Sequence, residues 1–456
     1  EHYLALPAEV LSTVMRAHQR YVPLYRQDAA SDPLALDARA SLLPRFLCIG
    51  NGLPEATDTV RRGNERVLKA RLADAEFFVQ ADRAVASIDR RAQLERVTFA
   101  EGLGSLLDRV ERLEWCTDVL LEQLQLPPAV AEHARRGAHL CKHDLVSQMV
   151  GEFPELQGVM GGKYLLAEGE SRDVALAVLE HYLPRGAGDA LPSSDAGAVV
   201  ALAERLELLL SIYAKGERPS GSSDPYALRR AGNGVLQILW SRGWSLDLVA
   251  LLQRATAHWA ELLPACGVEP PALALELADF LRQRLVSLLE EGGIDPDLVQ
   301  AVAGDSVPLE RVLRDPADAR QRADLLAALR ASGALAAVQA VVTRAARLAE
   351  KGNLPASVLS ATGVVDAGLF EQPSEAGMLA VLNGLEPIAT GTAADRYARL
   401  AAGLSDGASA LAAFFDGDQS VMVMADDPAV RNNRLHLLAV LRNQASVLAD
   451  FSRLSG

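Results

Sequence analysis

Residues 63–79 read GNERVLKARLADAEFFV. The apolar side chains in this stretch recur at the spacing of one helix face, so we predict an amphipathic helix over about residues 63–88. Its cations Arg62, Arg66 and Lys69 are spaced i, i+4 and i+7 and would share a face. Three cations on one face can hold a phosphate backbone, although a solvated helix face explains the same pattern.

The pattern changes on either side of this helix. Residues 1–60 are mixed, and short apolar runs such as residues 44–50 end in Gly, Asn and Pro, which predicts strands between helical pieces. Downstream, the periodicity is helical throughout. We predict a glycine loop at residues 158–162 and helices near residues 103–126, 128–149, 173–182, 198–214, 377–390, 394–416 and 428–453.

Composition excludes several classes of protein. The chain has 456 residues, which is long for a single core, and its net charge of −14 argues against a protein that coats nucleic acid by general attraction. Residues 261–330 alone carry 13 acidic against 7 basic side chains, and we interpret them as a helical connector. Four scattered cysteines do not form a CxxC spacing, and the sequence does not contain an apolar run of 18 residues, so we expect neither a disulfide scaffold nor a membrane span.

One cluster of residues could bind a metal. His139 and His143 are separated by one helical turn and Asp144 follows, which is the pattern of a metal-dependent HD-type phosphohydrolase with remote partners at His181 and at Glu204 or Glu207. Polar histidines in a domain that has lost the metal give the same pattern. Local signatures of a nucleophile or a phosphate-binding loop are absent from the sequence, so we do not assign a catalytic residue.

Two arginine-containing helix starts could bind RNA. After the polar loop 215–225, Asp224 and Pro225 should begin a helix that presents Arg229 and Arg230 to a phosphate, or one of these arginines pairs internally with Glu204 or Glu207.

Near the C-terminus, Asp426 or Asp427 should cap a helix that carries Arg431, Asn433 and Arg434. Arg and Asn are the residue types that read exposed base edges. Phe414 and Phe415, which precede this helix, are predicted to be core residues.

These segments together resemble the beta subunit of bacterial heterotetrameric glycyl-tRNA synthetase. The matching stretches occur in the order of that family and cover nearly the whole chain; they include residues 18–24, 63–78, 99–106, 142–161, 180–184, 224–230 and 414–435. Because the chain begins at Glu1 and the family's subunit is longer, we expect a fragment without the N-terminal part.

The resemblance implies a mainly α, multidomain protein. Residues 1–90 would be the end of an editing-domain-like α/β region, 91–260 an HD-like helical domain, 261–376 a helical connector and 377–456 an anticodon-binding helical bundle. The HD-like domain departs from a working phosphohydrolase, because this sequence has Glu204-Arg-Leu-Glu207 where an Asp-Lys-x-x-Asp-like element would be expected.

The resemblance also implies a function. The subunit would bind tRNA-Gly in the cytoplasm, as part of an α2β2 heterotetramer with the alpha subunit. Glycine activation with ATP and Mg²⁺ would take place on the alpha subunit, and this chain would need no cofactor of its own. The RNA contacts would come from Arg66, Lys69, Arg71, Arg229 and Arg230 toward the acceptor arm, and from Arg431, Asn433 and Arg434 at the anticodon.

Overall fold

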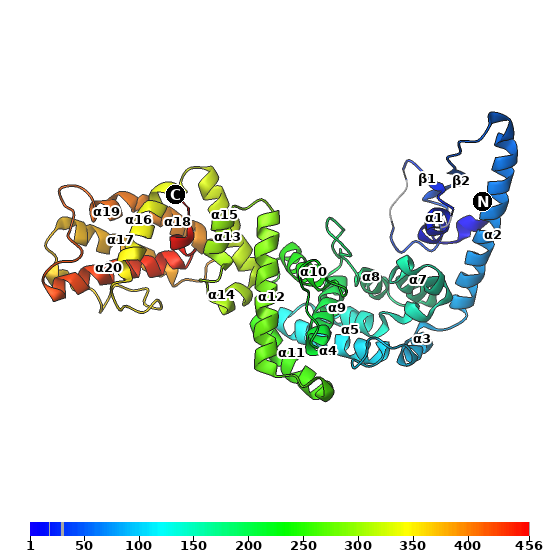
Figure 1. Ribbon diagram of the computed structural model, residues 1–456, viewed down its shortest axis with the longest axis horizontal. Helices are drawn as coiled ribbons and strands as arrows, with labels where there is room; N and C mark the ends of the chain where they lie inside the picture. Colours follow the sequence, from blue (N-terminus) through cyan, green and yellow to red (C-terminus); the bar gives the residue numbers. More distant parts are fainter. Residues whose placement is uncertain (18, 29–31, 456) are drawn as a thin grey trace. The chain divides into compact units, whose positions relative to one another are not determined.

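A computed structural model describes residues 1–17, 19–28 and 32–455, so His18 of the resemblance lies outside the described residues. The fold is mainly α-helical, as predicted (Figure 1). The chain forms two compact units, residues 1–244 with 251–277, and residues 245–250 with 278–456. The predicted boundary at residue 260 therefore falls inside the first unit, and the finer four-part division stays a prediction.

The first unit has one small antiparallel sheet and a series of helices. The sheet pairs β1 (Val22–Tyr25) with β2 (Leu42–Leu47). The helices are α1 (Ala8–Ala17), α2 (Thr57–Arg83), α3 (Ser87–Gln93), α4 (Leu106–Leu124), α5 (Pro128–Leu140), α6 (Gln148–Glu152), α7 (Val159–Glu168), α8 (Arg172–Glu180), α9 (Asp195–Ala214) and α10 (Leu228–Arg242). Two further helices, α11 (Leu248–Leu262) and α12 (Pro270–Glu291), contribute residues to both units.

Helix α9 is the centre of the first unit, and α4, α5, α8 and α10 all pack against it. It is buried on every side because Ala, Val and Leu occupy positions all round the helix. Only two of its acidic side chains, Glu204 and Glu207, enter this core. The partners of these two carboxylates therefore decide whether they could bind a metal.

Helix α2 confirms the amphipathic helix predicted over about residues 63–88, although it begins and ends about five residues before the predicted bounds. Leu68, Leu72, Ala75 and Val79 are buried and face α1 and the segment around α6. The strands β1 and β2 also confirm the short strands predicted before residue 60.

The predicted helix 128–149 is wrong beyond residue 140. Helix α5 ends at Leu140, Lys142 has a left-handed backbone with φ of 65°, and a short 3₁₀ turn starts at His143. The predicted glycine loop is also wrong, because Gly158 precedes α7 and Gly161 and Gly162 lie inside it. These two glycines let α7 approach its neighbours closely: a Cβ on Gly162 would lie 2.5 Å from the carbonyl oxygen of Ala175 in α8.

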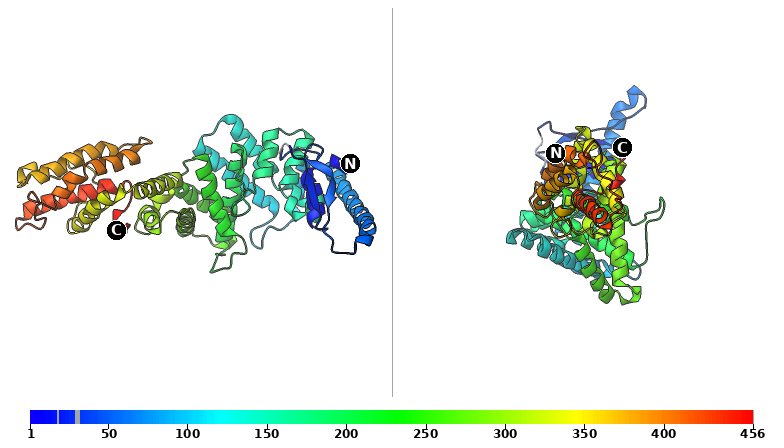
Figure 2. Two further views of the ribbon diagram at one scale, coloured as in Figure 1. Left: turned by 90° about the horizontal axis from the view of Figure 1, so that it is seen from above. Right: turned by 90° about the vertical axis from the view of Figure 1, so that its left-hand side faces the viewer.

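The second unit consists of helices and connecting loops, and its described residues form no strand. Its helices are α13 (Pro296–Ala303), α14 (Leu309–Leu313), α15 (Pro316–Ala331), α16 (Leu335–Ala349), α17 (Pro373–Ala389), α18 (Arg396–Asp406), α19 (Ala408–Ala413) and α20 (Pro428–Ser446). Helix α20 lies between α16 and α17 (Figure 2). Since α16 belongs to the segment interpreted as a connector, that segment supplies one wall of the C-terminal bundle.

Phe414 and Phe415 are buried in this bundle, which confirms their prediction as core residues. Among the described residues, no single helix is long and apolar enough to cross a membrane. Helices α15 and α16 together have the length and apolar composition of a membrane span, but the chain bends by 115° at their junction.

The close approach of α7 and α8 gives a test of the packing. We expect Gly162→Ala to lower the free energy of unfolding by about 1–3 kcal/mol, because the new methyl group collides with backbone that cannot move aside. Gly63→Ala is the control: Gly63 lies in α2 with open space around it, so alanine should leave the stability unchanged or raise it by up to about 1 kcal/mol. Denaturant unfolding followed by circular dichroism measures both, and equal effects would contradict the packing argument.

Candidate nucleic-acid interface

The exposed side of α2 carries the cations predicted to meet RNA. Arg66, Lys69 and Arg71 are all exposed, and among the described residues no carboxylate forms an ion pair with them. Arg62 and Arg66 lie near Lys69 on one flank of the helix. Arg71 follows Lys69 by two residues, a rotation of about 200°, and so lies on the other flank. The exposed side of α2 therefore carries a ridge of three cations and a separate fourth one.

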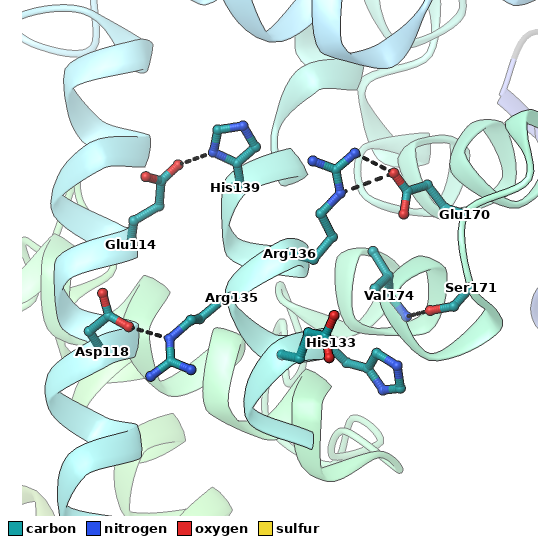
Figure 3. Close-up of a pocket in the computed structure, with 10 residues that line it drawn as sticks. Glu114, Asp118, His133, Arg135, Arg136, His139, Glu170, Ser171 and Val174 are labelled. Atoms are coloured by element: carbon teal, nitrogen blue, oxygen red, sulfur yellow. Dashed lines mark hydrogen bonds and ion pairs between the residues drawn. The ribbon is translucent and has the colours of Figure 1, made fainter. Parts of the chain in front are cut away.

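Helix α5 presents a second group of cations around a pocket of about 620 Å³. Figure 3 shows that Arg135, Arg136 and His139 each reach a carboxylate on a neighbouring segment. The pairs are Arg135 Nε with Asp118 at 2.6 Å, Arg136 Nε with Glu170 at 3.0 Å, and His139 Nδ1 with Glu114 at 2.9 Å. Because carboxylates already bind Arg135, Arg136 and the ring of His139, the pocket is a weak site for a phosphate.

The predicted metal site is not formed. His139 ends α5 at the surface pocket, whereas His143 is buried in the next turn, so the two histidines do not share a helix face. Asp144 uses its Oδ2 atom to accept hydrogen bonds from the amides of Gly158 and Gly161, at 2.6 and 2.9 Å. Among the described residues, no group of three or more His, Cys, Asp or Glu side chains could hold a metal ion.

The remote metal ligands suggested by the sequence have other partners. His181 is buried, and burial together with the nearby ammonium of Lys142 lowers its pKa to about 3. Glu204 and Glu207 are bound by the cations of Arg109, Arg112 and Lys142. Three fixed cations beside these carboxylates would repel a divalent metal. The phosphohydrolase alternative is therefore wrong for this arrangement of residues.

The carboxylates of α9 are the centre of a buried charged cluster in the first unit. Glu207 accepts from Arg109 Nε at 2.7 Å, from Arg112 Nε at 2.9 Å and from the hydroxyl of Ser211 at 2.7 Å. Glu204 accepts from Arg109 Nη2 at 2.8 Å and lies 2.8 Å from Lys142 Nζ. The cluster joins α4 and the turn after α5 to the central helix.

These contacts determine the protonation of the cluster. Burial by itself would raise the pKa of Glu204, but the cations of Arg109 and Lys142 outweigh it and hold the pKa at about 2. Burial works against the charge of Lys142, yet the carboxylate of Glu204 raises the lysine's pKa above its ordinary value. Both groups are thus charged at neutral pH.

The predicted phosphate site at residues 224–230 is only partly available. Asp224 lies outside α10 and caps it, because its carboxylate accepts from the amides of Leu228 and Arg229 at 2.8 and 2.9 Å. The expectation that a phosphate binds these amides is therefore corrected. Arg230 is exposed, and Arg229 is half-buried. Neither pairs with Glu204 or Glu207, whose partners are the cations named above.

At α20, only part of the predicted set reaches the surface. Arg431 is half-buried and donates one hydrogen bond, from Nη1 to the carbonyl of Ala425 at 3.1 Å, which leaves other donors of its guanidinium free to contact a ligand. Asn433 and Arg434 are buried, so their prediction as RNA contacts is corrected. Arg434 binds the carboxylates of Glu375 and Glu371 at 2.9 and 2.7 Å.

The sequence places both Asn432 and Asn433 beside the two arginines, and Asn432, not the predicted contact Asn433, is the one at the surface. It is exposed and lines a shallow cavity of about 400 Å³ with His436 and the loop 363–369, whereas Asn433 exchanges two hydrogen bonds with the backbone of Asp366. Helical phase could have distinguished the two asparagines. Asn433 lies one turn before Leu437, on the buried side of the helix, and Asn432 does not.

The buried cluster gives a stability prediction. Glu207→Ala should lower the free energy of unfolding by about 3–5 kcal/mol, because it leaves Arg109 and Arg112 charged and without their carboxylate in the core. Glu111→Ala, on the exposed side of α4, the helix that carries Arg109 and Arg112, should change the free energy of unfolding by no more than about 0.5 kcal/mol. Denaturant titration of both variants is the measurement, and a Glu207 effect as small as the control would contradict the role of the cluster.

The cluster also predicts a pH dependence. The pKa of Glu204 in the folded protein is lower than in the unfolded chain, so its contribution to stability is complete above about pH 4.5 and is lost as the pH falls toward 2. We expect Glu204→Gln to flatten the fall in unfolding free energy between about pH 6 and about pH 3. An unchanged slope would show that Glu204 is not the titrating group.

Comparison with known proteins identifies the family. Residues 1–304 match the family model described as "Glycyl-tRNA synthetase beta subunit". Glycine–tRNA ligase beta subunits of Acaryochloris marina, Trichodesmium erythraeum and Acidithiobacillus ferrooxidans are 46%, 43% and 39% identical to the chain. The matches cover 98%, 100% and 100% of the chain, respectively, and 62%, 62% and 61% of those relatives, so the chain spans less than two thirds of their length. The chain therefore belongs to the glycyl-tRNA synthetase beta subunit family.

Proposed function

We propose that this chain is the tRNA-binding part of a glycyl-tRNA synthetase beta subunit and supports the ATP-dependent attachment of glycine to tRNA-Gly. The proposal depends above all on the exposed ridge on α2. Arg62, Arg66 and Lys69 present three charges on one side of a helix in an otherwise acidic chain, as a binding site for an RNA backbone would.

The surroundings of α2 support this proposal. The opposite side of the helix is fixed in the core by Leu68, Leu72 and Val79, so the ridge is held on a rigid element. The Arg431 end of α20 offers guanidinium donors beside the exposed amide of Asn432. An unpaired base can be read by such groups, whereas a phosphate needs only their charge.

The remaining parts of the proposal concern partners. We propose that an alpha subunit activates glycine with ATP and Mg²⁺, and that it assembles with this chain as an α2β2 heterotetramer in the cytoplasm. The carboxylates that could have held a metal here, Glu204 and Glu207, are bound by arginine and lysine. This supports a recognition role for the chain, with no cofactor of its own.

The α2 ridge is tested by Arg66→Ala/Lys69→Ala in the full-length subunit assembled with the alpha subunit. Each lost phosphate contact should weaken binding to all tRNAs alike and reduce the slope of log affinity against log salt by about 1. Arg61→Ala is the matched control, because Arg61 on the same helix already pairs with Asp58 and Glu65. Filter binding of tRNA-Gly across a salt series measures both, and an unchanged slope would remove the ridge from the interface.

The α20 end should behave differently. Arg431→Ala should weaken the binding of tRNA-Gly by about 1–3 kcal/mol. It should also reduce the difference in affinity between tRNA-Gly and a tRNA with a changed anticodon. Arg434→Met should instead reduce stability, because Glu375 stays buried without its partner. Loss of affinity without loss of anticodon preference in the Arg431 variant would contradict base reading.

A further inference from the structure

The C-terminal bundle has a second basic surface, on a helix that the sequence placed in an acidic connector. Arg344, Arg347 and Lys351, at and just beyond the end of α16, are exposed and spaced i, i+3 and i+7. The opposite side of α16 is buried by Val338, Val342 and neighbouring alanines. The three cations therefore form one ridge of about 10 Å on the outer side of the bundle.

Two of the three cations are available for a ligand. Arg344 pairs with the exposed carboxylate of Asp416 at 2.9 Å and lies over the ring of Phe415, which fixes its position. Arg347 and Lys351 form no ion pair with any residue that the structure describes. Arg344 and Arg347 also line a groove of about 740 Å³, together with Ala336, Ala340 and Leu454, whose side chains carry no charge.

The ridge leads toward the end of α20 at which Arg431 lies. Near its start, α16 bonds the end of the chain, through Gln339 to Ser455 and Thr343 to Phe451. At its far end, Gly352 lies against Leu435, one turn after Arg431. The helices are thus antiparallel, and Lys351 is the cation of the ridge nearest the proposed base-reading end.

The charge around Arg431 explains why a separate surface is needed. Asp418, Asp426 and Asp427 are exposed in the segment before and at the start of α20. These carboxylates would repel phosphates and yet leave a base edge free to bond with Arg431. An RNA strand that places a base against α20 must therefore have its backbone bound at another surface. The α16 ridge is a cationic surface on the same bundle.

We propose that the outer side of α16, at Arg344, Arg347 and Lys351, binds the sugar-phosphate backbone of the tRNA beside the bases read at α20. This inference rests on the proposed function and deepens it. The occupant is an RNA backbone, because the cations of the ridge, two of which line the groove, complement phosphate charge, whereas a protein that docked only on the apolar residues of the groove would not require them.

The test uses the full-length subunit assembled with the alpha subunit, tRNA-Gly, and the variant Arg347→Gln/Lys351→Gln. Arg344 is kept, so that its contacts with Asp416 and Phe415 are not disturbed. We expect an affinity about tenfold lower at 0.1 M salt, a salt slope reduced by about 2, and an unchanged anticodon preference. The single variant Arg347→Glu should lose more affinity for tRNA-Gly than the single variant Arg347→Gln, because a carboxylate repels the phosphate.

Arg399→Gln is the matched control, since Arg399 is exposed on α18 of the same unit and pairs only within its own helix. It should leave the affinity and the salt slope unchanged, and all variants should keep the thermal midpoint of the parent. Parent-like tRNA binding by Arg347→Gln/Lys351→Gln overturns the inference, and loss of the alpha subunit with unchanged tRNA binding would assign the groove to a protein instead. If the parent complex itself does not bind tRNA-Gly, the proposed function fails, which is a different result.

Discussion

The buried contact between the arginines of α4 and the glutamates of α9 is the constraint on which the first unit depends. An ion taken out of water is tolerated only when an opposite charge and further hydrogen bonds meet it. Arg109, Arg112 and Glu207 meet this condition together, and Lys142 and Glu204 extend the cluster to the turn after α5. Because the loss of any one contact would leave an unpaired charge in an apolar core, the cluster fixes the register of α4 and of the turn after α5 on the central helix.

The second unit repeats the same solution. Arg434 binds Glu375, whose carboxylate also accepts from the amides of Glu371 and Gln372 at the start of α17. The guanidinium further donates to the carbonyl of Met422, so one side chain ties α20, α17 and the preceding loop together. The arginines of this acidic protein therefore include an interior group that organises helices, while at the surface some pair with carboxylates and others, such as Arg66 and Arg347, form no ion pair with a described residue.

The residues that resemble a metal site show how a pattern can persist with a changed role. Asp144 binds the amides at the start of α7, where a helix presents unsatisfied N–H groups and a partial positive charge. The Nε2–H of His143 donates to the carbonyl of Gly161 in the same helix at 3.2 Å, and burial lowers the pKa of His143. The pair now positions α7, which in turn needs Gly161 and Gly162 to pack closely.

The sequence by itself determined the helical class, the amphipathic helix that contains residues 63–79, the helices predicted near 103–126 and 173–182, and the burial of Phe414 and Phe415, because periodicity and turn residues are local properties. It also contained the resemblance that comparison confirmed at the level of the family. Only the tertiary structure decided which charges are free. Arg431 and Arg434 stand one turn apart on one helix, yet the second lies opposite Glu375 and the first does not. Whether an arginine meets a carboxylate or solvent depends on a partner about 60 residues away, and local spacing does not carry that information.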